Sequence, residues 1–437
     1  MARGKKKESA LTLEEKLAQA LVPVEEQPYK VPENWRWVWL PVTFENYTDS
    51  KKKVQQKTYL EDGPVSVIDQ GQELIGGYTD DESMLYSGEL PVVIFGDHTR
   101  CIKYIDFPFA QGADGVKVLK PKAFYSPKAF YYSLQAVDIP NMGYRRHFPL
   151  FDQYAMPVPP LAEQQRIVDR IEYLFAKLDE AKEKAQSVLD SFETRKAAIL
   201  HKAFTGELTT KWRAEHGLDM GNWTTRSLKN CGSWYGGGTP STTHPEYWEN
   251  GTLLWITSKD MKSDLIEDTL MHTTMLGVEN SSANYIEEPA VLFVMRSGIL
   301  RRTFPVCMVK KPFTVNQDLK ALVPNDIDLE YLFWACKAAE KEILEKCMKS
   351  GTTVESINAS ALQNFLIPVA GKEEQSEIVH ILDSLFAKEQ QAKEAAEAVL
   401  EKIDLLKKSI LARAFRGELG TNDPTEESAL ELLKSIL

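Results

Sequence analysis

A gapless internal repeat is the feature of this 437-residue sequence that most constrains its fold. When the chain is shifted by 211 positions, residues 157–208 align with residues 368–419, and 24 of the 52 aligned pairs are identical. The identities include Leu-Phe-Ala-Lys at 174–177 of the first copy and Gly-Glu-Leu at 206–208. A match of this length indicates that one long segment was duplicated.

Each copy has the hydrophobic spacing of a long helix, which in the first copy should run from about 161 to 203. Apolar residues recur in alternating steps of four and three from Ile167 to Ile199, and again from Ile378 to Ile410. A mean spacing of 3.5 residues keeps a narrow seam facing a partner helix. We therefore predict that the two copies pair with each other, the alternative being two separate surface helices. The predicted seam consists of Ile167, Ile171, Leu174, Leu178, Ala181, Ala185, Val188, Phe192 and Ile199 in the first copy, and of Ile378, Leu382, Leu385, Glu389, Ala392, Ala396, Val399, Ile403, Leu406 and Ile410 in the second.

Two polar residues and three helix breakers refine this prediction. Arg195 and Glu389 fall in the seam, where a polar residue can fix the register of a helix pair at a cost in stability. Pro160 is expected at the first turn of the first helix. Gly206 and Gly417 are expected to end the two helices in the left-handed conformation.

A third, partial copy lies near the N-terminus. Residues 15–21 (Glu-Lys-Leu-Ala-Gln-Ala-Leu) resemble the ends of the two long helices, and Glu33–Trp35 is echoed by Gly221–Trp223. The order is then helix end, globular block, long helix, globular block, long helix. This order predicts a circular arrangement with pseudo-twofold symmetry.

The two globular blocks, residues 31–156 and 213–367, are each expected to be α+β. They share one motif, because Pro108–Leu119 and Pro312–Leu322 both contain Pro-Phe, an Asp five residues after the Phe, a Lys and a Leu at nearly the same spacing. The blocks are therefore expected to be divergent copies of one fold. Residue content predicts strands at 64–68, 90–95, 252–257 and 290–295, and a helix at 329–348.

Both blocks concentrate positive charge. Residues 115–147 contain six Lys or Arg against one acid, with aromatic residues between them, and residues 296–311 contain five Lys or Arg and no acid. Basic clusters bind phosphates, and arginine also reads guanine edges; a solvated basic face is the alternative. Polar turns at 95–100 and 234–248 could add contacts or be plain loops. The candidate DNA-binding residues are Arg100, Lys117, Lys120, Lys122, Lys128, Arg145, Arg146, Thr239, Ser241, Thr242, Arg296, Arg301, Arg302, Lys310 and Lys311.

Composition and motifs exclude several classes of function. The net charge of −11 argues mildly against a nucleic-acid partner, but where the basic residues lie matters more than the total. No apolar run has the length of a membrane helix, and the five cysteines form no CxxC pair, so neither a zinc site nor a disulfide framework is indicated. Walker, HExxH and GxSxG motifs are absent, as is the Pro-Pro-aromatic segment of an adenine methyltransferase. We interpret the chain as non-catalytic, with no metal site, and expect it in the cytoplasm.

These features together resemble the DNA specificity subunit of type I restriction-modification systems. The resemblance rests on the helix starts at 159–175 and 370–386 and the helix ends at 199–208 and 410–419; Pro159 and Pro160 of the first copy are replaced by Ala and Gly in the second. It implies two target recognition domains separated by an antiparallel coiled-coil spacer. The implied divisions are an N-terminal arm and helix (1–30), target recognition domain 1 (31–156), spacer helix 1 (157–212), target recognition domain 2 (213–367), spacer helix 2 (368–420) and a C-terminal tail (421–437).

The resemblance also implies partners. Such a subunit binds a bipartite, asymmetric site on double-stranded DNA and docks two methyltransferase subunits, which nuclease subunits then join. The cofactors S-adenosylmethionine, ATP and magnesium would belong to those partners, and none to this chain. A coiled-coil scaffold that binds no DNA is the alternative; it explains the helices and the net charge but leaves the two basic stretches unexplained.

Overall fold

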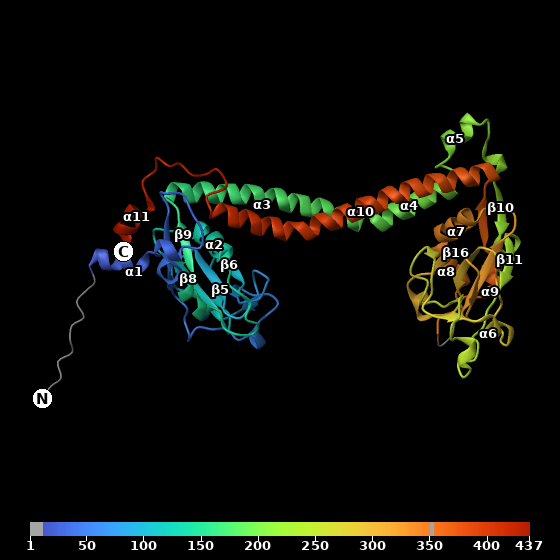
Figure 1. The fold of residues 1–437 in the computed structure, drawn as a ribbon, viewed down its shortest axis with the longest axis horizontal. Coiled ribbons are helices and arrows are strands. Elements are labelled where there is room, and N and C mark those ends of the chain that lie inside the picture. Colours follow the sequence, from blue (N-terminus) through green and yellow to red (C-terminus); the bar gives the residue numbers. More distant parts are fainter. Residues whose placement is uncertain (1–11, 350–353) are drawn as a thin grey trace. The chain divides into compact units, whose positions relative to one another are not determined.

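The computed structural model describes residues 12–349 and 354–437. The chain divides into two compact units, one formed by the residues up to Ala185 together with Ala398–Leu437, and the other by Gln186–Glu397. The division falls inside two long helices, α3 (Leu161–Asp190) and α10 (Lys372–Ala414), both labelled in Figure 1. None of the helices in the described residues has the length and apolarity needed to cross a membrane.

The first unit is built on two small sheets. A four-stranded sheet has the order β2-β8-β5-β6, and a three-stranded sheet has the order β4-β3-β7. Val93 and Phe95 of the central strand β5 are fully buried beneath α2, which begins at the N-cap Ser126. The bounds are Phe44–Asn46 (β2), Val65–Ile68 (β3), Gly77–Thr79 (β4), Val92–Gly96 (β5), Ile102–Ile105 (β6), Ala110–Gln111 (β7), Val116–Pro121 (β8) and Pro127–Ala136 (α2).

The second unit repeats this plan. Its larger sheet has the order β11-β18-β15-β16-β13 and its smaller sheet the order β14-β12-β17, so each strand of the first unit has a counterpart, with β13 added at one edge. The helix α7 takes the place of α2. The bounds are Gly232–Tyr235 (β11), Leu253–Ile256 (β12), Leu265–Ile266 (β13), His272–Thr273 (β14), Ala290–Val294 (β15), Val306–Val309 (β16), Phe313–Val315 (β17), Leu319–Pro324 (β18) and Leu329–Ala338 (α7). The predictions of α+β blocks, of one shared fold and of the four strands are therefore confirmed.

Each unit also contains a two-stranded ribbon that leads into a long helix. Residues Arg36–Trp39 (β1) pair antiparallel with Ala155–Val158 (β9) just before α3, and Thr224–Ser227 (β10) pair with Leu366–Val369 (β19) just before α10. The remaining helices are Leu13–Ala20 (α1), Phe192–Phe204 (α4), Thr210–Glu215 (α5), Met275–Glu279 (α6), Glu340–Cys347 (α8), Ala359–Asn364 (α9) and Ala429–Ile436 (α11).

The helices pair antiparallel within each unit, as predicted. In the first unit, Ile167 and Ile171 share a core with Leu411 and Phe415. Farther along α3, Asp179 lies 2.6 Å from Lys407, which comes earlier in α10.

The second unit shows the same direction of pairing. The Arg195 guanidinium donates to Glu389 at 2.8 Å, and the Thr209 hydroxyl donates to Glu374 at 2.6 Å. The two polar residues predicted in the seam are therefore partners of each other.

Three details of the helix predictions are wrong. The first long helix is interrupted at Ser191, whose hydroxyl donates to the Ser187 carbonyl at 2.5 Å and so competes with regular helical bonding. The segment 329–348 forms two helices that meet at Ala339, where the backbone (φ −89°, ψ 2°) leaves the helical region; the Glu340 side chain just after it accepts the Phe304 amide at 2.9 Å. Pro160 is the N-cap of α3, one residue before its expected place, because its carbonyl accepts the amide of Gln164, which is the first hydrogen bond of the helix.

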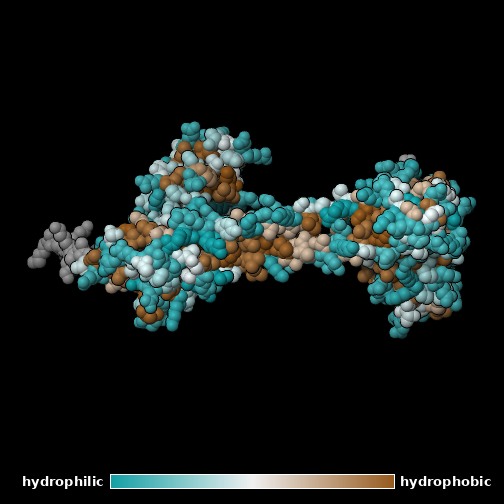
Figure 2. Space-filling view, turned by 90° about the horizontal axis from the view of Figure 1, so that it is seen from above, coloured by the Kyte–Doolittle hydropathy of each residue, from teal (hydrophilic) through white to brown (hydrophobic). Residues whose placement is uncertain are grey.

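The seam prediction also fails in part of the second copy. Ala392 is exposed, and so are Val399 and Leu406, with exposed fractions of 39% and 47%. Leu405 is 67% exposed beside them, and Figure 2 shows hydrophobic surface along the long helices. A spacing of 3.5 residues identified the helix but placed too many of its residues against the partner helix.

Both glycines end their helices as predicted. Gly206 has a φ of 81° and Gly417 a φ of 75°, which is the left-handed region. After Gly417, the Glu418 amide donates to the Arg413 carbonyl at 2.9 Å, and the Gly417 amide donates to Ala414 at 3.1 Å, which is the Schellman arrangement.

A repeated Glu-Gln pair fastens each long helix to its block. Gln164 donates to the Phe124 carbonyl at 2.8 Å and accepts the Ser126 amide at 2.7 Å. Its counterpart Gln375 donates to the Ala370 carbonyl at 2.8 Å and accepts the amide of Asp328, the N-cap of α7, at 3.0 Å.

The adjacent glutamates form the second half of this fastening. Glu163 accepts the Trp35 indole N–H at 2.6 Å, and Glu374 accepts the Trp223 indole N–H at 2.9 Å. The echo between residues 33–35 and 221–223 therefore corresponds to an equivalent contact in each unit.

Candidate nucleic-acid interface

In the first block, four of the candidate cations gather around the turn that follows β5. Asp97 organises this region from a buried position: its carboxylate accepts the Phe148 amide at 2.7 Å and lies 3.9 Å from the Lys117 ammonium. Arg100 has a left-handed φ of 60°, and its guanidinium donates to the Ile139 carbonyl at 2.7 Å. The turn is thereby tied to the loop that carries the exposed cations Arg145 and Arg146.

The other candidates of this block lie elsewhere. Lys120 lies 3.7 Å from Glu89, and Lys122, half-buried, follows the end of β8. Lys128 donates to Glu172 of α3 at 2.6 Å, and that hydrogen bond raises the pKa of Lys128 above its usual value. The structure thus gives Lys128 a partner on the spacer helix and does not bring it to the Arg100 cluster.

In the second block, a hollow of about 560 Å³ lies where β15 ends and β18 begins. This place corresponds to the end of β5 and the start of β8 in the first block. It is lined by Arg296, Gln317, Lys320 and Lys349, among others. Arg296 donates to Asp318 at 2.8 Å, and the Thr239 hydroxyl donates to Gln317 at 2.7 Å. Thr239 and Arg296, two of the sequence candidates, are thereby linked through neighbouring residues.

The remaining candidates of the second block are exposed and mostly partnered. The Ser241 hydroxyl bonds the Thr243 hydroxyl, and Thr242 is exposed beside it. Arg301 bonds Glu355 and holds the pKa of that carboxyl below its usual value. Lys310 bonds Glu330, Lys311 donates to the Glu267 carbonyl at 2.6 Å, and Arg302 lines a separate hollow.

Sequence reasoning missed Lys320, although the signal was present. Lys117 lies opposite Phe95 in the pairing of β8 with β5, and Lys320 lies opposite Phe293 in the pairing of β18 with β15. The shared Pro-Phe motif already aligned the two lysines. Lys320 is therefore the structural counterpart of Lys117, and the two blocks each present a lysine at the same position of the sheet.

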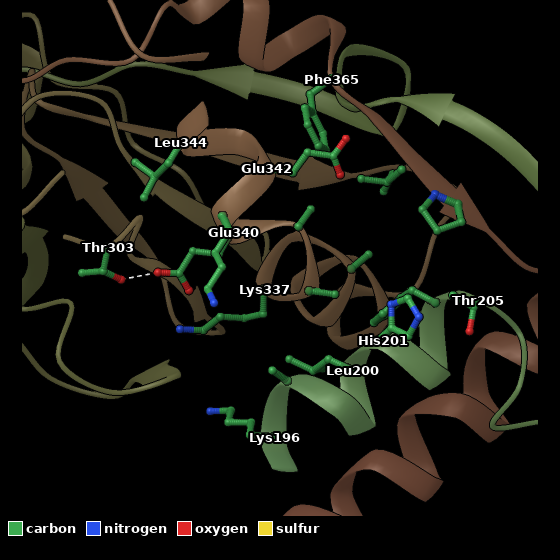
Figure 3. Close-up of a pocket in the computed structure, with 18 of the residues that line it drawn as sticks. Lys196, Leu200, His201, Thr205, Thr303, Lys337, Glu340, Glu342, Leu344 and Phe365 are labelled. Carbon is green, nitrogen blue, oxygen red and sulfur yellow. Dashed lines mark hydrogen bonds between the residues drawn. The ribbon is translucent and has the colours of Figure 1, made fainter. Parts of the chain in front are cut away.

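A second pair of equivalent hollows lies where each long helix ends against its block. In the second unit the hollow measures about 720 Å³ and includes Phe204 and Pro368. In the first unit it measures about 550 Å³ and includes Phe415 and Pro157, which are the same positions of the repeat. Figure 3 shows Lys196, Lys337 and His201 at the second-unit hollow, which is distinct from the Arg296 edge.

Comparison with known proteins shows which family this chain resembles in sequence. A family model described as "Type I restriction modification DNA specificity domain" matches residues 220–402. The specificity subunit of the type I restriction enzyme EcoR124I/EcoR124II of Escherichia coli is 30% identical over 367 residues, which cover 79% of this chain and 85% of that protein. The EcoKI specificity subunit of Escherichia coli strain K12 is 24% identical over 286 residues, covering 62% of this chain and 58% of that protein.

Solved structures share the fold. The HsdS subunit of Thermoanaerobacter tengcongensis superposes with a TM-score of 0.60 at 19% identity, covering 91% of this chain and all of that one. The duplicated blocks and these relatives define a DNA-recognition protein. The chain belongs to the family of type I restriction enzyme specificity subunits. It is a sequence-specific DNA-recognition subunit without a catalytic role of its own, and the scaffold alternative is not favoured.

Proposed function

We propose that this chain reads a bipartite, asymmetric site on double-stranded DNA, with one half-site bound by each block. Residues 31–156 and 213–367 are the two target recognition domains in this proposal. The supporting observation is that both blocks have one sheet topology and carry cations at one edge of it, yet surround those cations with different loops. Two similar scaffolds with different loops suit two different half-sites.

The residues that gather at these edges are the proposed DNA contacts. In the first block they are Arg100, Lys117, Arg145 and Arg146; in the second they are Thr239, Arg296, Lys320 and Lys349. Cations of this kind bind phosphates, and arginine also binds guanine edges. Lys128 and Lys310 are weaker candidates because each bonds a carboxylate away from these groups: Lys128 bonds Glu172 of α3, and Lys310, which does not line the Arg296 hollow, bonds Glu330.

The repeated helices are the proposed docking surface for two methyltransferase subunits, which nuclease subunits then join. Two observations support this assignment: the equivalent hollows at the helix ends, and the exposed Val399, Leu405 and Leu406 on α10. An exposed apolar patch is typical of a protein–protein interface. The partners would supply S-adenosylmethionine, ATP and magnesium, and the assembled enzyme would act in the cytoplasm.

Binding measured across a salt series tests the DNA contacts of the first block. The complex of this chain with its methyltransferase subunits is titrated with cognate duplex. Replacing Arg145 and Arg146 together by Ala should lower affinity and reduce the magnitude of the salt slope by about 2, since each lost phosphate contact removes about 0.9. The matched control is Lys128→Ala, which removes a cation of the same block that bonds Glu172. Equal losses from both changes would show that the contact surface is assigned wrongly.

The second block has its own matched pair of variants. Lys320→Ala should weaken binding of the cognate duplex, whereas Lys310→Ala, which removes a cation already paired with Glu330, should leave it nearly unchanged.

Mapping of methylated adenines, with each block in turn exchanged for the corresponding block of a relative, tests whether each block reads one half-site. One half-site should change with each exchange, and a change in both half-sites would contradict it.

A further inference from the structure

The loop between α2 and the buried His147 carries an aromatic side chain with no core to cover. Tyr144 is 90% exposed, the highest fraction among the large hydrophobic residues of the described chain, and Met142 beside it is 43% exposed. Arg145 and Arg146, which directly follow Tyr144, are also exposed. A tyrosine this exposed contributes little to the stability of the fold, so its presence in the loop has another explanation.

The loop is nevertheless held firmly at both ends. The His147 ring is fully buried: its Nε2 accepts the Met142 amide at 3.1 Å, and its Nδ1 lies 2.9 Å from the Asp97 carbonyl. Since a carbonyl only accepts, we assign the proton to Nδ1 of a neutral ring. At the other end the Arg100 guanidinium holds the Ile139 carbonyl. The tip is therefore presented in a preset conformation, which lowers the entropy cost of binding.

The tyrosine ring is itself supported from one side. It stacks on His98, with ring centroids 5.1 Å apart and an interplanar angle of 22°. The His98 Nδ1 lies 3.2 Å from the Tyr144 carbonyl, which fixes the imidazole under the ring. One face of the phenol is thus backed by a second ring, and the exposed fraction of Tyr144 leaves the other side open.

An open aromatic face next to two exposed arginines has the chemistry of a base-stacking site. Aromatic side chains stack on bases, including bases at a step that has been opened, while arginines hold the neighbouring phosphates. We propose that Tyr144 stacks on a base of the half-site read by the first block, with His98 as the positioning residue behind it. This inference rests on the proposed function, because it requires that block to bind DNA.

Three substitutions at one position test the stacking. The complex with methyltransferase subunits is titrated with cognate duplex, with duplexes changed at single bases of either half-site, and with a duplex carrying 2-aminopurine in the first half-site. Tyr144→Ala should lower cognate affinity about 10-fold, since stacking on one base contributes about 1–3 kcal/mol. It should also abolish the 2-aminopurine fluorescence change and relax discrimination in the first half-site only. Tyr144→Phe should retain all three properties, and Tyr144→Leu should lose them.

The controls separate this inference from the proposed function. Tyr47→Ala removes another exposed tyrosine of the same block, outside the loop, and should behave as wild type. The salt slope of Tyr144→Ala should equal that of wild type, because no phosphate contact is lost. If Tyr144→Ala or Tyr144→Leu binds and discriminates as wild type while the Arg145 and Arg146 double variant has the expected smaller salt slope, stacking is wrong and the DNA-binding surface stands. If wild type itself shows no salt-dependent binding, the proposed function fails.

Discussion

The two units keep the same buried glutamate at the start of the long helix but satisfy it differently. In the first unit Glu163 accepts hydrogen bonds from the indole of Trp35 and, at 2.7 Å, from the amide of Asn422. Both donors are neutral, and burial raises the pKa of Glu163 above its usual value. The carboxylate is stabilised there by dipoles alone, apart from the more distant charge of Arg166.

In the second unit Glu374 has a cation as partner. Arg213 of α5 forms a buried ion pair with it at 2.5 Å, and the Thr209 hydroxyl donates at 2.6 Å. Both copies therefore keep the buried glutamate and the tryptophan that donates to it. The other donors, Asn422 in the first unit and Arg213 in the second, come from the segment that follows the neighbouring helix and differ between the units. The two fastenings are therefore equivalent in position but unequal in electrostatics, and that inequality can be measured.

The largest difference is expected from removing the cation. Arg213→Met leaves the Glu374 carboxylate buried without its counter-charge and should destabilise the second unit by about 3–5 kcal/mol. Asn422→Ala removes one neutral donor from Glu163 and should cost about 1–3 kcal/mol. Hydrogen exchange resolved by unit measures both effects. Adding Glu374→Gln to Arg213→Met should recover part of the loss, and equal costs in the two units would contradict the comparison.

A smaller difference is expected at the two helix ends. Ala at either glycine costs about 1–2 kcal/mol because both have left-handed backbones. A Cβ at Gly417 would also meet Pro32 Cγ at 2.5 Å, whereas one at Gly206 would meet the flexible Met220 side chain at 2.6 Å. Gly417→Ala should therefore be the more destabilising change. Urea unfolding of the two single variants measures this, and a larger loss for Gly206→Ala would show that the proline moves more easily than the methionine.

The sequence was sufficient to predict the repeat, the helix ends and the shared block fold, because these depend on local rules. The period of the long helices and the left-handed glycines can be recognised from residue type and spacing. The Pro-Phe motif aligns Lys117 with Lys320, which the strand register confirms. The interruption at Ser191 was not predictable in this way. It depends on a side chain competing for its own helix carbonyl, which many helical serines do not do.

The candidate site was predictable in composition but not in arrangement. Lys128 and Arg145 belong to one basic stretch, yet one bonds Glu172 of the spacer helix and the other lies in an exposed loop. Linear charge density cannot distinguish them, because the distinction depends on which acids tertiary packing brings near. Tyr144 is one of several aromatic residues in that stretch, and only the structure shows that it is exposed whereas Phe124 and Tyr125 are buried.

The pH dependence of stability should also differ between the units. The pKa of Glu163 is higher in the folded unit than in the unfolded chain, so its contribution to stability is fully present below about pH 4, near the unfolded value, and is lost as pH rises through the folded-state value. Glu163→Gln cannot ionise, so the first unit of this variant should gain stability relative to wild type between pH 4 and pH 7. Glu374→Gln is the control, because it breaks the pair with Arg213 and should be destabilising at neutral pH. A difference between Glu163→Gln and wild type that stays constant over this range would contradict the assignment.

The smallest effect is expected in the middle of the helix pair, where each unit has one ion pair. Arg195 and Glu389 are half-buried at 2.8 Å, and a double-mutant cycle to Ala should give a coupling of about 1 kcal/mol. Asp179 and Lys407 of the first unit, with the carboxylate 53% exposed, should give less, on the order of 0.3 kcal/mol.

Replacing Arg195 and Glu389 together by Leu should leave stability unchanged or raise it, because the desolvation penalty of a half-buried ion pair offsets much of its attraction and apolar packing has no such penalty. The role of the pair would then be to fix helix register, and disulfide trapping between cysteines placed at successive positions of α4 and α10 should capture several registers in the double-Leu variant but one in wild type. A single register in both proteins would show that the glutamate and glutamine fastenings at the helix starts already suffice.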